Sequence, residues 1–447
     1  MDYIKKRKEI LEGNLFKTIL SLALPIMLTN FVQTLYDLTD SYYIGKLGGI
    51  QVAAISFVWP VTYLIISLGT GIGVATTSLV SISIGEKNYK KASIFSGQSI
   101  SFSFILSIIL TIIGYYLAPE ILSFMKAQGE LLKESIVYCR IILLSTPFLF
   151  FNQVFTSIKQ GEGNTLSPLI LSIISVFINI ILNPIFIFNF GWGIAGAAWA
   201  TVIARMFVTI YSSYLLFFKN QGIKIYKKHL VFHKNIIKRI IKIGLPSSIG
   251  QGFSSLGFIV LNVFIIKFGE DAMAAFGIGN RINSLLFLPC MGLGMGLTSI
   301  VGQNLGANNI NRIKDAVKTS VIITIIFSIF SILLIHSFDQ YIISFFTSDD
   351  GIKKMSLDYL RLISLSIPGL GLMQILISIY QGASHTKTAM FITMSRLWLF
   401  RLPMIIFFQH FTNIKEFGIW YSMVYSNYFV VALGAIFYFK GTWKIKK

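Results

Sequence analysis

Charge is scarce in this sequence. Only 13% of its 447 residues are charged, 54% are hydrophobic, and the mean hydropathy is +0.73. Residues 101–117 and 321–335 contain no charged side chain at all. A soluble protein of this length needs far more charge to cover its surface, so we predict an all-α polytopic membrane protein. Apolar runs of this length also argue against a porin-like barrel, whose segments are short and alternate in polarity.

Cysteine and histidine are scarce as well. Cys139 and Cys290 both lie in apolar segments and predict no disulfide framework. The five histidines are scattered, without the HExxH spacing of a zinc helix. The glycine-rich residues 69–78 and 292–299 have no strand before them and no P-loop lysine, so we interpret them as sites of close helix packing. We therefore expect no cofactor and no enzymatic activity. If the protein transports a substrate, we expect ion gradients to supply the energy.

Acidic residues are outnumbered by basic ones, 18 to 38, which gives a net charge of +20. The basic residues form no groove with interleaved aromatics, so we expect no nucleic-acid partner. They gather instead at both termini and in alternate loops between apolar segments. Such clusters face the cytoplasm in membrane proteins. We therefore predict a multi-pass protein of the cytoplasmic (inner) membrane with both termini cytoplasmic.

Windows of about twenty residues predict twelve transmembrane helices. They lie near residues 15–43, 52–78, 93–117, 135–158, 166–189, 194–218, 238–266, 273–300, 316–337, 357–380, 388–410 and 417–439.

An internal repeat organises these helices. When the second half is aligned on the first with one constant shift and no gap, Leu24-Pro25 meets Leu245-Pro246, YCRIILLSTP meets YLRLISLSIP, and Gln160-Gly161 meets Gln381-Gly382. This pattern predicts a tandem duplication of a six-helix unit. We assign residues 1–218 to an N-terminal lobe, 219–237 to a basic cytoplasmic linker and 238–447 to a C-terminal lobe.

Because six is an even number, the two repeats share one topology and are parallel. Two parallel repeats facing a central cavity are typical of transporters that alternate between inward-open and outward-open states. A duplication can also merely enlarge a scaffold. Pro25 and Pro246, at matched positions, should kink their helices. Each kink is either a hinge for alternating access or a static packing feature.

Two carboxylates stand out at the end of the first apolar segment. A charged residue inside a bilayer costs about 2.5–3.5 kcal/mol on insertion scales and usually marks a function. Asp37 and Asp40 lie three residues apart, on roughly one helical face, with Tyr36 adjacent. This face can bind a cation or hold a proton. Alternatively, both carboxylates lie close to interfacial water at the end of a long helix.

The fifth predicted span adds neutral polar groups. Asn179 and Asn183 are one turn apart and Pro184 follows them, while the sixth span contributes Thr201. Amide oxygens suit a hard monovalent cation, and the proline leaves one backbone carbonyl without its helical donor. These groups can equally join helices by hydrogen bonds.

Three arginines lie within or near predicted spans: Arg205, Arg396 and Arg401. In the C-terminal half, Arg396 and Arg401 can repel cations or bind anionic head groups, or they can snorkel to an interface.

The whole chain resembles the multidrug and toxic compound extrusion (MATE) family. The resemblance rests on the order and spacing of LALPIMLTNFVQTLYDLTDSYYIGKLG, GEKNYKKA, KQGEGNT, LNPIFIF and GIAGAAWATVIAR. It implies an antiporter that exports amphipathic, mostly cationic compounds in exchange for Na⁺ or H⁺. The implied partners are these small molecules and membrane lipid, and we expect a monomer.

The resemblance also implies an ion or proton site in the N-terminal lobe. Its aspartate, asparagine and threonine fall on Asp40, Asn179 and Thr201, where Na⁺ can bind together with Asn183. Where the family usually has a second acidic residue, this sequence has Asn183, and Asp37 can restore the missing negative charge. Tyr36 and Asp37 would support this site, and Tyr138, Asn152 and Gln153 are placed to complete the polar network. A second cation site, known in another branch of the family, is not expected, because Gln251 and Gln374 stand where that branch has acids.

Two rival functions stay open. The first is a flippase for lipids or lipid-linked oligosaccharides of the same superfamily, which would need a strongly cationic cavity. The second is a membrane receptor or structural protein without turnover, which would leave the repeat and the aspartates unexplained.

Overall fold

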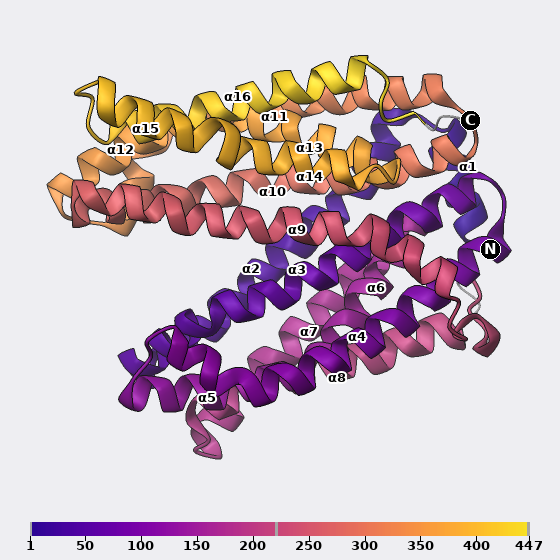
Figure 1. Ribbon diagram of the computed structural model, residues 1–447, viewed down its shortest axis with the longest axis horizontal. Coiled ribbons are helices and arrows are strands. Elements are labelled where there is room, and N and C mark those ends of the chain that lie inside the picture. The colour runs from indigo at the N-terminus through magenta and orange to yellow at the C-terminus, as the bar shows by residue number, and fades with distance from the viewer. Residues whose placement is uncertain (1, 220–221, 445–447) are drawn as a thin grey trace. The chain divides into compact units, whose positions relative to one another are not determined.

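The computed structural model describes residues 2–219 and 222–444, and every regular element in these ranges is a helix (Figure 1). In the first half these are α1 (Asp2–Glu12), α2 (Leu15–Gly45), α3 (Gly49–Gly85), α4 (Tyr89–Phe124), α5 (Gly129–Leu144), α6 (Thr146–Glu162), α7 (Leu166–Pro184), η1 (Ile185–Asn189) and α8 (Gly193–Phe217). In the second half they are η2 (Lys227–His229), α9 (Lys234–Ile265), η3 (Ile266–Phe268), α10 (Glu270–Gly306), α11 (Ile310–Phe346), α12 (Asp350–Ser364), α13 (Ile367–Gly382), α14 (Thr386–Met394), η4 (Ser395–Arg401), α15 (Leu402–Phe411) and α16 (Phe417–Phe439). Residues 220–221 of the predicted linker lie outside the described ranges.

The helices are long and apolar enough to cross a membrane. Within the described ranges ten helices meet this condition, or up to twelve if each of two bent helix pairs is one span. The predicted all-helical membrane fold is confirmed.

The two bent pairs correct the sequence prediction locally. The spans predicted at 135–158 and 357–380 are not single helices, because α5–α6 and α12–α13 each bend by 46°. Pro147 and Pro368 lie in the first turns of α6 and α13. A proline has no N–H to continue the preceding hydrogen-bond ladder, so the helix restarts there in a new direction.

The repeat is confirmed in local detail. Asn88 caps α4 by accepting a hydrogen bond from the Lys91 amide, and Asn309, at the matched position of the second repeat, caps α11 in the same way. The residues just before these caps, Lys87 and Asn308, both have positive φ, at 59° and 56°. Each repeat therefore makes the same turn after its second long helix.

Glycines allow the helices of each repeat to pack closely, as predicted. A Cβ on Gly73 would lie 2.7 Å from the Ser157 hydroxyl, and one on Gly294 would lie 2.7 Å from the Ser378 hydroxyl. Both distances are too short for a real side chain, so these helices can approach only where the side chain is absent.

The described residues pack into two compact units. Unit 1 is formed by residues 2–10, 28–219 and 222–248, and unit 2 by residues 11–27 and 249–444. Helices α2 and α9 each contribute to both units, and each changes unit two residues after its proline, Pro25 or Pro246. Both helices are continuous through the proline. The hinge role of the two prolines and the predicted lobe boundaries stay predictions.

Candidate ion-coupling site

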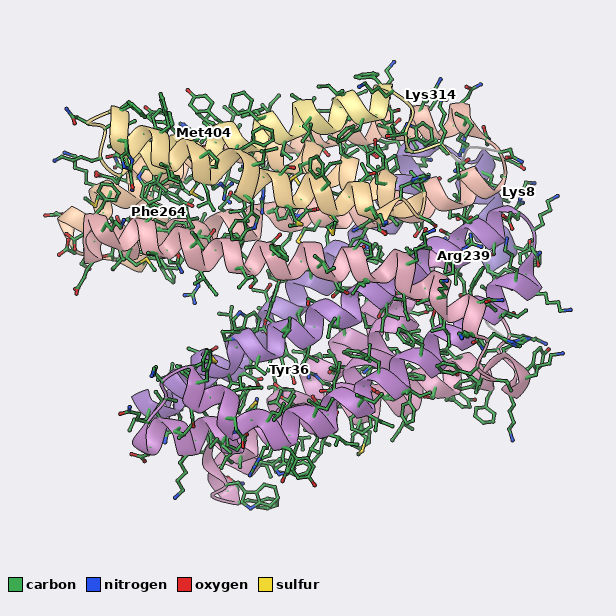
Figure 2. The ribbon with its side chains drawn as sticks, viewed as in Figure 1. Lys8, Tyr36, Arg239, Phe264, Lys314 and Met404 are labelled. Carbon is green, nitrogen blue, oxygen red and sulfur yellow. The ribbon has the colours of Figure 1, made fainter. Side chains whose placement is uncertain are left out.

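Three helices of unit 1 bring the predicted polar residues together. Tyr36 and Asp40 lie one turn apart on α2, and Asn179 and Asn183 lie one turn apart on α7. Thr201 comes from α8. Figure 2 labels Tyr36 on α2, and its side chain is buried. The i,i+4 spacing on α2 and α7 places each pair on one helical face.

Asn183 joins the carboxylate to the rest of the site. Its side-chain amide nitrogen donates to Asp40 Oδ1 over 2.7 Å and to Asn179 Oδ1 over 3.0 Å. On the other side of the carboxylate, the Thr201 hydroxyl donates to Asp40 Oδ2 over 3.4 Å. Both carboxylate oxygens of Asp40 therefore accept a hydrogen bond from a neutral side chain.

Tyr36 closes these contacts into a ring. Asn179 Nδ2 donates to the Tyr36 hydroxyl over 3.0 Å, and that hydroxyl donates to Thr201 Oγ1 over 3.0 Å. We call these five residues (Tyr36, Asp40, Asn179, Asn183 and Thr201) the coupling ring. It holds one carboxylate, two hydroxyls and two amides, and four of its members are buried.

One atom of the coupling ring lacks a partner. Both asparagine side chains are fully buried, yet Asn183 Oδ1 accepts no hydrogen bond within the described residues. A buried amide oxygen without a donor is costly and calls for a ligand or a proton donor. A hard monovalent cation at the ring, or a proton on the adjacent Asp40, would satisfy this oxygen.

Asp37 lies outside the coupling ring. Its side chain is exposed on unit 1 and accepts a hydrogen bond from Gln33 Nε2 over 3.3 Å. It makes no hydrogen bond to a ring member within the described residues. Tyr138, from α5, lies close enough to Asp40 for the two to interact electrostatically, also without a hydrogen bond in that part of the chain.

Asn152 and Gln153 of α6 contact other groups. Asn152 donates to the Arg205 backbone carbonyl over 3.3 Å and accepts from the Ser212 hydroxyl over 3.2 Å. Gln153 packs against Gly73 of α3. The two residues join α6 to α8 and to α3, and neither is hydrogen-bonded to the coupling ring within the described ranges.

Arg205 is a further neighbour of the coupling ring, and the sequence did not predict a role for it at this site. It follows Thr201 by one turn on α8, and its Nη1 donates to Ser145 Oγ over 2.7 Å. It lies close enough to Asp40 to interact electrostatically. The i,i+4 spacing from Thr201 was the available signal. A guanidinium here balances carboxylate charge in the apolar interior of unit 1.

Pro184 marks the end of the regular part of α7. Immediately after it the chain forms the π-helix η1, in which the residues bond five positions apart. The proline cannot donate to the carbonyl one turn earlier, which is the reason sequence analysis singled it out. Short π-helical turns are frequent at functional sites, and this one directly follows Asn183.

The chain is similar to known transporters over nearly its whole length. The sequence model of the MatE family matches residues 25–185 and again residues 246–407, once in each repeat. The chain is 28% identical over 432 residues to the probable multidrug resistance protein YoeA of Bacillus subtilis (strain 168), covering 95% of this chain and 93% of that protein. It is 29% identical over 363 residues to the multidrug export protein MepA of Staphylococcus aureus (strain N315), covering 80% and 79% of the two chains.

Solved structures agree with this match. A multidrug resistance MATE family transporter of the MOP superfamily, in its outward-facing conformation, superposes with a TM-score of 0.91 and 27% identity over 96% of each chain. Two family matches that together cover most of the chain also place it among transporters rather than enzymes. The chain belongs to the MatE family, the multidrug and toxic compound extrusion transporters.

Proposed function

We propose that this protein is an antiporter that exports amphipathic, mainly cationic compounds in exchange for Na⁺ or H⁺ bound at Asp40. The relatives described above, a probable multidrug resistance protein and a multidrug export protein, support the export of drugs. The preference for amphipathic cations follows from the family resemblance. The coupling ring supports the exchange mechanism, because it presents a membrane carboxylate together with neutral oxygens.

The observation that carries the proposal is the unsatisfied Asn183 Oδ1 beside Asp40. The coupling ring holds one carboxylate, so one bound Na⁺ or one proton neutralises it. Binding of that ion replaces a charged, incompletely bonded ring by a neutral one. Such a difference between loaded and empty states is what an ion needs to shift a transporter between two conformations.

We further propose that the protein acts in the cytoplasmic membrane as a monomer with both termini cytoplasmic. The basic loops support this orientation by the positive-inside rule.

An apolar depression on unit 1, lined by Leu35, Leu38, Thr39, Tyr42, Tyr43 and Ile180, supports contact with lipid tails or amphipathic compounds.

The test is ethidium efflux from proteoliposomes under separate Na⁺ and pH gradients, with Asp40→Asn compared with the unaltered protein. The substitution keeps the size of the side chain and one of its two acceptor oxygens, and it removes the ionisable group. We expect one gradient to drive efflux by the unaltered protein and Asp40→Asn to lose that coupled efflux.

Asp37→Asn is the matched control, because it removes a carboxylate three residues away that lies outside the coupling ring. We expect it to keep coupled efflux. Normal efflux by Asp40→Asn would refute the assignment of the ring. If the unaltered protein moves no ethidium under either gradient, a flippase assay with labelled lipid is the next experiment.

A further inference from the structure

Unit 2 contains a buried arginine that has no carboxylate partner among the described residues. The Arg401 side chain is 2% exposed and donates to Ser426 Oγ over 3.1 Å, to Asn427 Oδ1 over 3.1 Å and to the Met423 carbonyl over 3.4 Å. All three acceptors are neutral and lie on α16. The Nη1 group donates no hydrogen bond within the described residues, so part of the guanidinium still has hydrogen-bonding capacity.

The segment that ends at Arg401 and the three helices that pack against it supply no carboxylate. Arg401 ends η4, which packs against α14, α15 and α16. None of these four segments contains an aspartate or a glutamate. Helix α12, which carries Tyr359 near Arg401, contains Asp350 and Asp358, but neither forms an ion pair with Arg401 within the described residues. A buried guanidinium is normally paired, because leaving the charge uncompensated in an apolar interior is costly.

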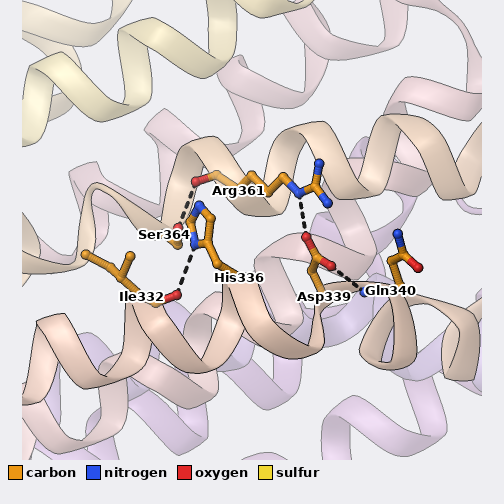
Figure 3. Close-up of polar contacts among 6 residues, drawn as sticks. All are labelled: Ile332, His336, Asp339, Gln340, Arg361 and Ser364. Carbon is orange, nitrogen blue, oxygen red and sulfur yellow. Dashed lines mark hydrogen bonds and ion pairs between the residues drawn. The ribbon is translucent and has the colours of Figure 1, made fainter.

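Another arginine of unit 2 shows the usual solution. Arg361 of α12 donates to Asp339 of α11 over 2.5 Å, and Asp339 also accepts from the Gln340 amide (Figure 3). The Arg361 side chain is 47% exposed, yet it has a carboxylate. Arg401 is far more buried and has no carboxylate partner within the described residues. Unit 2 can therefore place a carboxylate beside an arginine, and it does not do so at Arg401.

A second cation lies near Arg401. Arg396 is the second residue of the same π-helical segment, five residues before Arg401, and is close enough to interact electrostatically with it. In a π-helix the backbone bonds join residues five apart, which is the spacing of these two arginines. The buried Nε of Arg396 has no hydrogen-bond partner within the described ranges. Two like charges in one apolar region increase the need for a negative group.

A neutral donor completes the surroundings. The Tyr359 side chain of α12 is fully buried, interacts electrostatically with Arg401, and its hydroxyl has no hydrogen-bond partner in the described part of the chain. Its ring is held by Trp420, with centroids 4.6 Å apart. A fixed hydroxyl beside a guanidinium can donate to an anion and cannot neutralise the arginine by itself.

We propose that Arg401, Arg396 and Tyr359 form a binding site for one small monovalent anion in unit 2. The occupant is either a free halide or the carboxylate group of an anionic substrate, since both present a single negative charge to N–H and O–H donors. The two units then carry sites of opposite polarity, a cation site at Asp40 and an anion site at Arg401. The anion site does not depend on which ion couples at Asp40.

The experiment is equilibrium binding of radiolabelled chloride to the purified protein in chloride-free buffer, followed by competition with benzoate. We expect saturable binding that is lost in Arg401→Gln and weakened several-fold in Tyr359→Phe. The Phe variant keeps the ring packing against Trp420 and removes only the hydroxyl, so it tests the site even if Arg401→Gln does not fold. Arg361→Gln is the matched control and should bind chloride as the unaltered protein does.

The competition identifies the occupant. Displacement of chloride only at benzoate concentrations well above those of chloride supports a halide site, and displacement at much lower concentrations supports a site for substrate carboxylates. Absence of saturable binding of either anion would overturn the proposal. Equal chloride binding by Arg401→Gln and the unaltered protein would overturn it too, by placing the anion elsewhere.

Discussion

A buried ion pair in unit 1 holds the linker between the repeats, and breaking it should release that linker. Lys159 Nζ and Glu162 Oε2 of α6 lie 2.9 Å apart, with side chains 3% and 2% exposed. The other carboxylate oxygen, Glu162 Oε1, accepts the backbone amide of Ile223 over 2.7 Å. The perturbation is Glu162→Gln, which keeps an oxygen acceptor for Ile223 but removes the charge opposite Lys159.

The geometry sets the size of the effect. At 2.9 Å and an effective dielectric of about 20, the attraction between two unit charges is roughly 6 kcal/mol. Desolvation of both groups offsets much of this attraction, and removal of one partner of a buried pair typically costs about 3–5 kcal/mol. The Lys91–Glu86 pair has a similar length, 2.7 Å, but its side chains are 36% and 35% exposed. Its loss should cost at most about 1 kcal/mol.

The assay is trypsin cleavage of the folded protein at Lys224, which follows Ile223. When opening is fast relative to cleavage, the cleavage rate tracks the population of the open linker. If about 3 kcal/mol of the lost stability acts on this local opening, Glu162→Gln should speed cleavage about 100-fold. Glu86→Gln is the control and should change the rate only a few-fold. The double variant Lys159→Met/Glu162→Gln removes both charges and should recover most of the protection. Equal rates for Glu162→Gln and Glu86→Gln would refute the reasoning.

Two further predictions concern unit 2 and the linker. Gly279→Ala would place a Cβ 2.1 Å from the Tyr359 ring, and Gly277→Ala would meet no atom within 4 Å. In thermal unfolding in detergent, Gly279→Ala should therefore be destabilised by about 1–3 kcal/mol, and Gly277→Ala should not be destabilised. Burial lowers the pKa of His229, whose Nδ1 accepts the Tyr226 amide. The unfolded linker therefore binds more protons than the folded linker as the pH falls. The contribution of His229 to the stability of the folded linker should be fully present above about pH 6.5 and should be lost as the pH drops towards the lowered pKa of the folded state. Hydrogen exchange across the linker, corrected for intrinsic rates, should show this loss in the unaltered protein and not in His229→Gln.

Much of the fold could be predicted because hydrophobic length and repetition are local properties of the sequence. A membrane span needs only an apolar run, and the constant shift between the repeats is visible at matched prolines and glycines. The bends at Pro147 and Pro368 were missed because no charged residue lies within five residues of either proline to interrupt the apolar run. Hydropathy measures the apolar character of a segment but contains no information on where its hydrogen-bond ladder restarts.

The coupling ring was predictable in part for a similar reason. Spacings of four residues on α2 and α7 placed Tyr36 with Asp40 and Asn179 with Asn183, and the structure brings these pairs together with Thr201. The spacing of Asp37 and Asp40 could not predict which of the two carboxylates is covered and which is exposed. Three residues on a helix are about 60° out of register, which is enough for the neighbouring helices to cover one carboxylate and leave the other exposed. Only the packing of α7 and α8 against α2 decides which one is covered.

The repeat also explains why the second polar cluster was harder to find. A duplicated backbone suggests duplicated sites, yet at the matched positions of the second repeat Leu261 stands for Asp40 and Ser426 stands for Arg205. The polar groups of the two units therefore diverged while their turns, caps and glycine contacts remained. Arg401 could be named from the sequence, but a long arginine near a span can snorkel to water as easily as it can be buried. Its burial among neutral acceptors on α16 is a tertiary property, and it is this property that turns a basic residue in an apolar run into a candidate anion site.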